Sequence, residues 1–160
     1  MPLKFHPYDS SWVAQIRNGG VDDYAQPTER SISDGVGNPC RHCLQFIPEG
    51  EGFLICAARP FPELQPYAET GPIFLCAANC VAWAGQGIPP VLRHSPNYLL
   101  KGYSADYRIV YGTGKITPTD DIERTLIEIL MQDKVAFVDV RSALNNCFLC
   151  RVISNPSARG

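Results

Sequence analysis

Residues 121–140, DIERTLIEILMQDKVAFVDV, decide the fold class, because two different hydrophobic periodicities follow each other within them. Over residues 121–132 the apolar side chains recur at helical spacing, and Asp120 with Glu123 gives a capping-box pattern at the start. Residues 135–140 are almost continuously apolar, which is typical of an interior strand. The stretch therefore predicts one long amphipathic helix followed by a buried strand.

Short runs of apolar and β-branched residues, bounded by glycine, proline or other turn residues, predict further strands. These runs are residues 53–57, 73–77, 98–103, 106–111 and 147–153. We expect residues 98–103 and 106–111 to pair as a hairpin. About six or seven short strands with one long helix predict an α+β fold, in which the helix packs on one face of a curved antiparallel or mixed sheet.

The composition predicts a loop-rich, single-domain protein. Gly 13 and Pro 14 in 160 residues exceed the average share, and a hydrophobic content of 45% is sufficient for a core. A chain of this length corresponds to one domain. We expect residues 1–160 to form that domain, with a less regular segment at 1–38 and a motif-bearing core at 39–153.

The charge and hydropathy patterns argue against two classes of partner. Lys+Arg 14 against Asp+Glu 16 gives a net charge of −2, so no basic field is present to hold nucleic acid. The longest apolar runs, residues 53–58 and 73–78, are far shorter than the roughly 18 residues of a membrane span. The N-terminus has no apolar stretch of the kind found in secretory signals. We therefore expect a cytoplasmic protein that binds neither nucleic acid nor membrane, and the sequence leaves its oligomeric state open.

Seven cysteines raise the question of metal or thiol chemistry. An odd number in a chain without an export signal argues against a disulfide framework. Two C-x-x-C pairs, Cys40 with Cys43 and Cys147 with Cys150, have zinc-ligand spacing. The second pair lies in an expected strand, where residues i and i+3 point to opposite faces, so a metal is not favoured. If zinc is bound, the expected ligands are Cys40, Cys43 and Cys147. The cysteines expected to be buried in the core are Cys56, Cys76 and Cys150.

Cys40 is the best candidate for a reactive thiol. The Asn-Pro dipeptide before it predicts the start of a short helix, with Cys40 in the first turn. The helix dipole and the neighbouring Arg41 and His42 would lower the pKa of this thiol, and Cys43 could act as a resolving thiol. Cys40 and Cys43 are therefore candidate catalytic residues, and the alternative is that both sulfurs only pack into the core. Cys80 stands four residues after Cys76 and would share a face with it if a helix began by Cys76, but the strand expected at residues 73–77 argues against that helix.

Arginine supplies ten of the fourteen basic residues, and several arginines lie beside apolar strands. Arginine tolerates partial burial when it meets a carboxylate or phosphate in bidentate geometry. These side chains form either separate structural ion pairs or, if they converge, a pocket for a small anion.

Several motifs together cover the chain from about residue 39 to residue 151. They are PCRHCL at 39–44, RPF at 59–61, PYAETGPIF at 66–74, RIVYGTG at 108–114, VRSA at 140–143 and NCF at 146–148. In these motifs the chain resembles the uncharacterised bacterial domain-of-unknown-function family 1203. The resemblance implies a shared polar pocket, because polar residues fall inside the motifs. The implied ligand-binding residues are Arg41, Glu69, Arg108, Arg141, Ser142 and Asn146.

The first functional expectation is a cytoplasmic domain that binds a small anionic ligand in this arginine-lined pocket. One alternative is a thiol-dependent enzyme or redox protein that uses Cys40 and Cys43. The other is a zinc-stabilised interaction module, and zinc is the only cofactor considered. The sequence leaves open the identity of the ligand and whether the protein is an enzyme.

Overall fold

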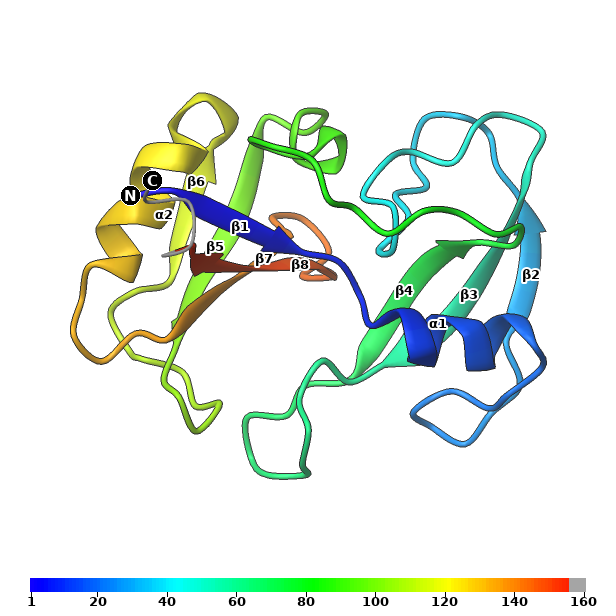
Figure 1. Ribbon diagram of the computed structural model, residues 1–160, viewed down its shortest axis with the longest axis horizontal. Coiled ribbons are helices and arrows are strands. Elements are labelled where there is room, and N and C mark those ends of the chain that lie inside the picture. Colours follow the sequence, from blue (N-terminus) through cyan, green and yellow to red (C-terminus); the bar gives the residue numbers. More distant parts are fainter. Residues whose placement is uncertain (156–160) are drawn as a thin grey trace. The chain divides into compact units, whose positions relative to one another are not determined.

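The computed structural model describes residues 1–155, and the chain divides into two compact units. One unit joins Met1–His6 to the chain from Gly85 onward, and the other is Pro7–Ala84. The described residues form two helices and eight strands in two antiparallel sheets. Figure 1 labels these elements. The α+β class is confirmed, although the strands form two sheets where one was expected. The expectation of a single domain stays a prediction.

The first unit is built on a five-stranded sheet with the order β1-β8-β7-β5-β6. Its strands are β1 (Leu3–His6), β5 (Asn97–Tyr103), β6 (Lys115–Pro118), β7 (Phe137–Ser142) and β8 (Phe148–Ser154). In Figure 1 the N-terminal strand β1 lies beside β8, and Leu3 stands opposite Ser154 in the register. This sheet therefore joins two segments from opposite ends of the sequence.

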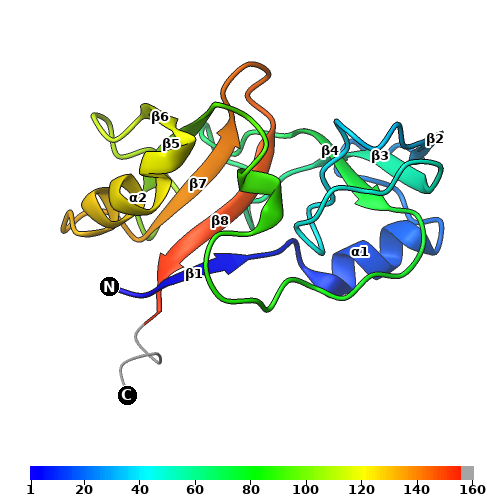
Figure 2. The ribbon, with the colours of Figure 1, turned by 90° about the horizontal axis from the view of Figure 1, so that it is seen from above.

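Helix α2 (Ile122–Leu130) packs against β5 and β7 of this sheet, next to which it lies in Figure 2. Ile122, Leu126 and Ile129 form its buried face, as the helical spacing predicted. The helix is shorter than expected, and the expected capping box is not formed, because Asp121 is the N-cap and makes no side-chain cap bond. The same unit contains two 3-10 turns, η1 (Pro90–Leu92) and η2 (Thr119–Asp121). Within the described part of the chain, no helix is long and apolar enough to cross a membrane.

The second unit combines helix α1 with a three-stranded sheet in the order β2-β3-β4. Its elements are α1 (Ser10–Arg17), β2 (Glu29–Ile32), β3 (Gly52–Ala58) and β4 (Gly71–Cys76). The Asp9 carboxylate caps α1 by accepting a hydrogen bond of 3.0 Å from the backbone N–H of Trp12. This cap satisfies one of the free N–H groups of the first turn.

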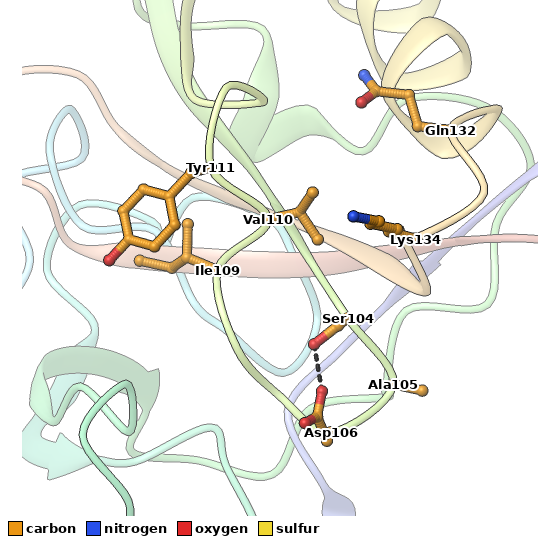
Figure 3. Close-up of a pocket in the computed structure, with 8 residues that line it drawn as sticks. All are labelled: Ser104, Ala105, Asp106, Ile109, Val110, Tyr111, Gln132 and Lys134. Carbon is orange, nitrogen blue, oxygen red and sulfur yellow. Dashed lines mark hydrogen bonds between the residues drawn. The ribbon is translucent and has the colours of Figure 1, made fainter.

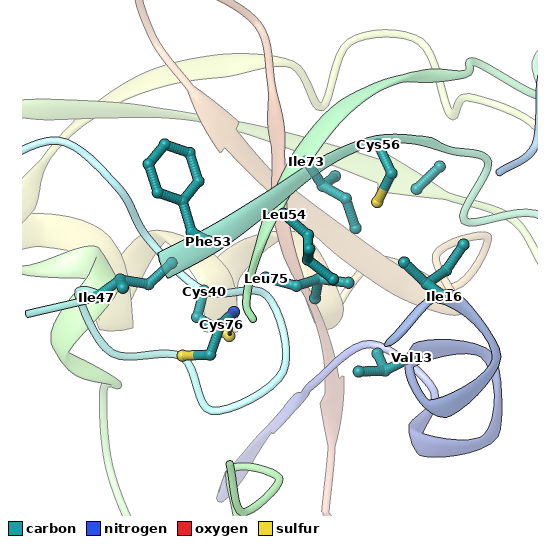
Figure 4. Packing of buried hydrophobic residues seen from close by; sticks show 11 residues of the cluster. Val13, Ile16, Cys40, Ile47, Phe53, Leu54, Cys56, Ile73, Leu75 and Cys76 are labelled. Atoms are coloured by element: carbon teal, nitrogen blue, oxygen red, sulfur yellow. Dashed lines mark hydrogen bonds between the residues drawn. The ribbon is translucent and has the colours of Figure 1, made fainter. Parts of the chain in front are cut away.

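The core of the second unit forms where α1 meets β3 and β4. Figure 4 shows Val13 and Ile16 of the helix with Leu54 and Leu75 of the two strands, and all four are buried. Buried cysteines extend this apolar cluster toward the end of β4. The core therefore fixes the part of the chain in which most of the cysteines lie.

The hairpin expected between residues 98–103 and 106–111 is formed only at its tip, because residues 106–111 do not make a strand. Strand β5 pairs instead with β6 and β7, and residues 106–111 make a turn with a single bridge from Tyr103 to Ile109. Tyr107 has φ 64°, and this left-handed conformation interrupts an extended course. The Ser104 hydroxyl accepts the N–H of Arg108, which holds the turn closed.

Candidate metal centre

Four cysteines of the unit Pro7–Ala84 bring their sulfur atoms together. All four Sγ atoms lie within 4.8 Å of one another. Cys40 Sγ is 3.9 Å from Cys80 Sγ, and Cys43 Sγ is 4.0 Å from Cys76 Sγ. We call this group the cysteine cluster, and its members are Cys40, Cys43, Cys76 and Cys80.

A tight turn supplies the first two sulfurs. The N–H of Leu44 donates to the carbonyl of Cys40 over 3.0 Å, and the N–H of Cys40 donates to the carbonyl of Gln45 over 2.9 Å. Leu44 has φ 55°, a left-handed conformation that is uncommon outside glycine and that reverses the chain. Because this segment is a turn, the short helix expected from Cys40 onward is not formed, and no helix dipole acts on Cys40.

The end of β4 supplies the other two sulfurs. Cys76 lies in a strand, as predicted, and is its last residue. Cys80 follows after the strand has ended. The N–H of Arg41 donates to the carbonyl of Phe74 over 3.1 Å, which fastens the turn to β4. The N–H of Cys76 donates to Cys40 Sγ over 3.3 Å. The backbone therefore holds the turn against the strand and brings the sulfurs together.

Polar side chains surround Cys80. Arg17, the last residue of α1, donates from Nη2 to Cys80 Sγ over 3.0 Å and from Nε to the carbonyl of Cys76 over 3.0 Å. His42 Nδ1 lies 3.2 Å from Cys80 Sγ, and its Nε2 lies 2.9 Å from the Ser10 hydroxyl. A neutral imidazole with its proton on Nδ1 satisfies both contacts, because it donates to the sulfur and accepts from the hydroxyl. Two N–H donors therefore favour the thiolate form of Cys80.

Hydrogen bonds between the four sulfurs lower the pKa of two thiols and raise the pKa of the other two. Hydrogen bonds from the Cys43 and Cys76 thiols lower the pKa of Cys40 to about 6. Hydrogen bonds from the Cys40, Cys43 and Cys76 thiols, together with one from His42, hold the pKa of Cys80 well below its usual range. The pKa values of Cys43 and Cys76 are raised, because these thiols donate to Cys40. The hydrogen bonds within the cluster therefore favour the thiolate form at Cys40 and Cys80 over Cys43 and Cys76.

The remaining cysteines lie outside the cluster. Cys147 belongs to the other unit, and its thiol lies 3.7 Å from the carbonyl oxygen of Asn145. The zinc set considered from the sequence, Cys40 and Cys43 with Cys147, is therefore replaced by one that contains Cys76 and Cys80. Cys56 and Cys150 are buried, as expected, and burial raises the pKa of Cys56 to about 12. The sequence signal that identifies the cluster is a C-x-x-C pair followed by a C-x-x-x-C pair.

The six residues of the expected anion pocket are divided between the two units. Arg41 and Glu69 lie in Pro7–Ala84, and Arg41 is buried, with Nη1 donating to the carbonyl of Pro39 over 2.8 Å. Its guanidinium also lies over the Phe74 ring, 5.5 Å from the centroid. Arg41 therefore supports the turn that carries Cys40, and convergence of the six residues on one pocket stays a prediction.

Three of the other four residues lie close together, two at the end of β7 and Asn146 in the connection to β8. Arg141 Nε donates to the backbone carbonyl of Asn146 over 3.1 Å and to its side-chain oxygen over 2.8 Å. The Ser142 hydroxyl accepts the N–H of Asn145 over 3.0 Å. Arg108 lies in the turn after β5, where its Nε is 3.8 Å from a carboxylate oxygen of Asp106 and both side chains are well exposed. Arg141 and Ser142 therefore make hydrogen bonds to the connection that follows β7, and their part in an anion site stays a prediction.

The pocket in Figure 3 lies in the same unit and has a volume of about 770 Å³. Its lining residues are Ser104, Ala105, Asp106, Ile109, Val110, Tyr111, Gln132 and Lys134. None of the six expected ligand residues is among them. Lys134 is its one basic lining residue, and Asp106 contributes an opposite charge, so this pocket gives no support to an anion site.

Comparison with known proteins identifies the family of the chain but assigns no activity to it. A family model described as "Protein of unknown function (DUF1203)" matches residues 37–153. No curated protein and no solved structure matched the chain. The matched range contains all four residues of the cysteine cluster.

Proposed function

Because the chain belongs to the DUF1203 family, whose description assigns no activity, we propose a function from the cysteine cluster itself: this protein is a zinc-binding module in which the cluster holds one zinc ion. The observation that carries the proposal is the approach of all four sulfurs to within 4.8 Å. A four-cysteine set is a closed coordination shell, so the role of the metal is structural.

The sulfur separations fit tetrahedral zinc. With Zn–S bonds of about 2.3 Å, neighbouring sulfurs of a tetrahedron lie about 3.8 Å apart. The separations of 3.9 Å for Cys40 with Cys80 and 4.0 Å for Cys43 with Cys76 are close to this value. Only small movements are needed to complete the coordination.

The positive charge and the N–H donors around the cysteine cluster also fit a zinc–thiolate site. A zinc ion with four thiolates carries a net charge of −2, which is costly in a partly buried site. The guanidinium of Arg17 and the imidazole of His42 contact Cys80, and the N–H of Cys76 contacts Cys40. Such donors stabilise thiolate ligands and fix their orientation.

Bound zinc would join three segments of the second unit. It would tie the turn at residues 39–46 to the end of β4 and to the chain after it, where residues 77–84 form no helix or strand. Metal binding adds to folding free energy when the unfolded chain has no site, with apparent values of about 10–16 kcal/mol in zinc-finger peptides near neutral pH. A zinc ion would therefore order a segment that has few backbone hydrogen bonds of its own.

A thiol-redox function is the second candidate, because the same sulfur separations allow disulfides after a movement of about 2 Å. Zinc is favoured because the donors around Cys80 and Cys40 stabilise anions, whereas a disulfide carries no charge. Both functions need reduced thiols at the outset, which agrees with the expectation of a cytoplasmic protein. The anion pocket has less support, because Arg41, Arg141 and Ser142 make internal contacts.

Metal analysis tests the proposal. The full chain is purified without chelator, and zinc is measured by mass spectrometry and its ligands by X-ray absorption. We expect about one zinc per chain, with four sulfur neighbours at about 2.3 Å. The variants Cys40→Ser and Cys76→Ser should lose most of the zinc, and the matched control Cys147→Ser should retain it. Folded, reduced protein with far less than one zinc, or with zinc that depends on Cys147, would contradict the proposal.

A further inference from the structure

The four residues of the cysteine cluster differ in their exposure to solvent. Cys40 has 0% and Cys76 has 9% of its surface exposed, whereas Cys43 and Cys80 are only partly buried. A small oxidant or alkylating agent in water therefore reaches Cys43 and Cys80 first. Exposure alone does not distinguish these two.

Hydrogen bonding distinguishes them. Cys80 Sγ accepts from Arg17 and contacts Nδ1 of His42, at 3.0 Å and 3.2 Å. Cys40 accepts the N–H groups of Cys76 and Cys43. In the described part of the chain, Cys43 Sγ contacts the Cys76 sulfur and has no N–H donor. When all four residues are zinc thiolates, no thiol proton remains between Cys43 and Cys76, so no hydrogen bond from the described residues withdraws further electron density from Cys43.

N–H donors withdraw electron density from a metal-bound thiolate, and the nucleophilicity of sulfur falls as its basicity falls. Cys43 is the one ligand that combines solvent access with the absence of such a donor among the described residues. On the premise that zinc is bound as proposed above, we infer that Cys43 is the reactive thiolate of the site, oxidised by hydrogen peroxide, resolved by Cys76, and thereby releasing the metal.

The chemistry balances without another reactant. The Cys43 thiolate attacks one peroxide oxygen, the O–O bond breaks, and a sulfenic acid and hydroxide are formed. The Cys76 thiolate, whose sulfur lies 4.0 Å away, then attacks the Cys43 sulfur and displaces a second hydroxide, which leaves a disulfide. Hydrogen peroxide is reduced by two electrons and the two thiolates are oxidised by two. Cys40 and Cys80 remain as ligands, and two thiolates do not complete the four-coordinate site, so zinc leaves.

The same geometry predicts a different reactive residue in the metal-free protein. There the Cys43 sulfur lies 4.0 Å from the Cys76 sulfur, whereas Cys80 Sγ accepts a hydrogen bond from the Arg17 guanidinium over 3.0 Å, which favours its thiolate form. Cys80 is also partly exposed, so it becomes the accessible thiolate. Zinc therefore moves the point of attack from Cys80 to Cys43.

The first test maps the initial product on the full-length chain, with Cys147→Ser as background to remove a bystander thiol. Zinc-loaded and zinc-free samples receive less than one equivalent of hydrogen peroxide. Free thiols are then alkylated, disulfides are located by mass spectrometry, and released zinc is read with a chromogenic chelator. We expect a Cys43–Cys76 disulfide with one zinc released per disulfide in the loaded protein, and Cys80 as the first residue modified in the zinc-free protein. A disulfide that contains Cys80 in the loaded protein would overturn the inference.

The second test uses two ligand exchanges that are matched in chemistry. Cys43→His and Cys80→His each replace one thiolate by an imidazole, which is also a zinc ligand. Peroxide-driven zinc release should slow by about tenfold or more in Cys43→His and stay within about threefold of the parent in Cys80→His. Equal slowing in both variants contradicts the inference. If either exchange prevents zinc binding, the disulfide mapping decides alone. Absence of zinc from the parent protein refutes the proposed function, whereas stoichiometric zinc with attack at Cys80 refutes only the role of Cys43.

Discussion

The guanidinium of Arg17 donates to Cys80 Sγ over 3.0 Å and, through its Nε, to the backbone carbonyl of Cys76 over 3.0 Å. One side chain at the end of α1 therefore holds both members of the C-x-x-x-C pair. The contact joins the helix of the second unit to the sulfur atoms that we propose as zinc ligands. It also gives the cluster its nearest fixed positive charge.

Replacing Arg17 should weaken zinc binding without removing a ligand. We expect Arg17→Ala to lower zinc affinity by about 10- to 100-fold, as measured by competition with a chromogenic chelator, because outer contacts of this kind tune metal affinity. Arg17→Lys should lose less, because it keeps the charge while losing the paired geometry. Arg124→Ala removes one positive charge from an exposed ion pair with Asp121 in α2 and should leave affinity unchanged. Equal affinity in Arg17→Ala and the parent would contradict this role.

Removal of zinc should loosen the second unit selectively. With chelator present, we expect faster backbone hydrogen exchange in residues 39–46 and 76–84, because the metal is proposed to join these segments. Exchange in β7 and β8, which pair with each other in the other unit, should change little and serves as the internal control. An equal loss of protection from hydrogen exchange in both units would show that zinc does not stabilise the second unit selectively.

The buried ion pair between Asp139 and Arg151 should be sensitive to loss of one partner. Asp139 is 0% exposed and accepts Nε and Nη2 of Arg151 over 2.8 Å and 3.0 Å. Burial raises the pKa of Asp139, and Arg151 opposes that rise. We expect Arg151→Met to reduce the free energy of unfolding by about 3–5 kcal/mol in urea denaturation, because it leaves a buried carboxylate without its cation.

The double variant Asp139→Leu/Arg151→Met removes both charges and should recover most of that loss. A double variant as unstable as Arg151→Met would mean that the packing of Arg151 over the Phe137 ring, at 4.0 Å from the centroid, matters more than its charge.

Cys56 should make folding stability depend on alkaline pH. Burial raises the pKa of Cys56 from 9.0 to about 12 in the folded protein. Above pH 9 the unfolded chain loses this proton while the folded chain keeps it, so the contribution is complete below pH 9 and is lost as pH rises toward 12. The loss amounts to about 1.4 kcal/mol per pH unit in this range.

The difference in free energy of unfolding between the parent and Cys56→Ala is measured by urea denaturation at pH 8 and at pH 10.5. Because both proteins share every other ionisable group, this difference isolates Cys56. Cys56→Ala should be less stable than the parent at pH 8, because it empties part of the core, and the gap should narrow at pH 10.5. A gap that stays constant or widens would contradict the pKa direction.

Local sequence patterns predicted those parts of the fold that depend on local interactions. The helix at α2 and its buried face follow from the spacing of Ile122, Leu126 and Ile129. The pairing of β5 with β6 and β7, and the division into two sheets, depend on contacts between segments far apart in the sequence, which periodicity does not encode. The run at residues 106–111 has strand composition, but its local turn interactions and the left-handed Tyr107 prevail.

The sequence also predicts part of the cysteine cluster, namely the pair Cys40 and Cys43. The strand prediction for Cys76 is correct. It did not predict the cluster, because a strand that continued beyond Cys76 would keep the Cys76 and Cys80 sulfurs apart. A continued strand would hold residues four apart at about 13 Å, but β4 ends at Cys76, so the chain can turn and bring the Cys80 sulfur to within 4.8 Å of the Cys76 sulfur. The left-handed Leu44, which brings Cys40 and Cys43 to one point, was not readable, because leucine rarely adopts that conformation.

The pairing of β1 with β8 also bears on the order of folding during synthesis. The five-stranded sheet places Leu3 opposite Ser154, so it closes only after residue 154 has left the ribosome. The unit Pro7–Ala84 interrupts that sheet in the sequence and contains its own helix, sheet and proposed zinc ligands. It can therefore fold, and would take up the proposed zinc ion, while the strands that follow are still being translated. The nascent chain would then hold its first strand unpaired until the last one arrives.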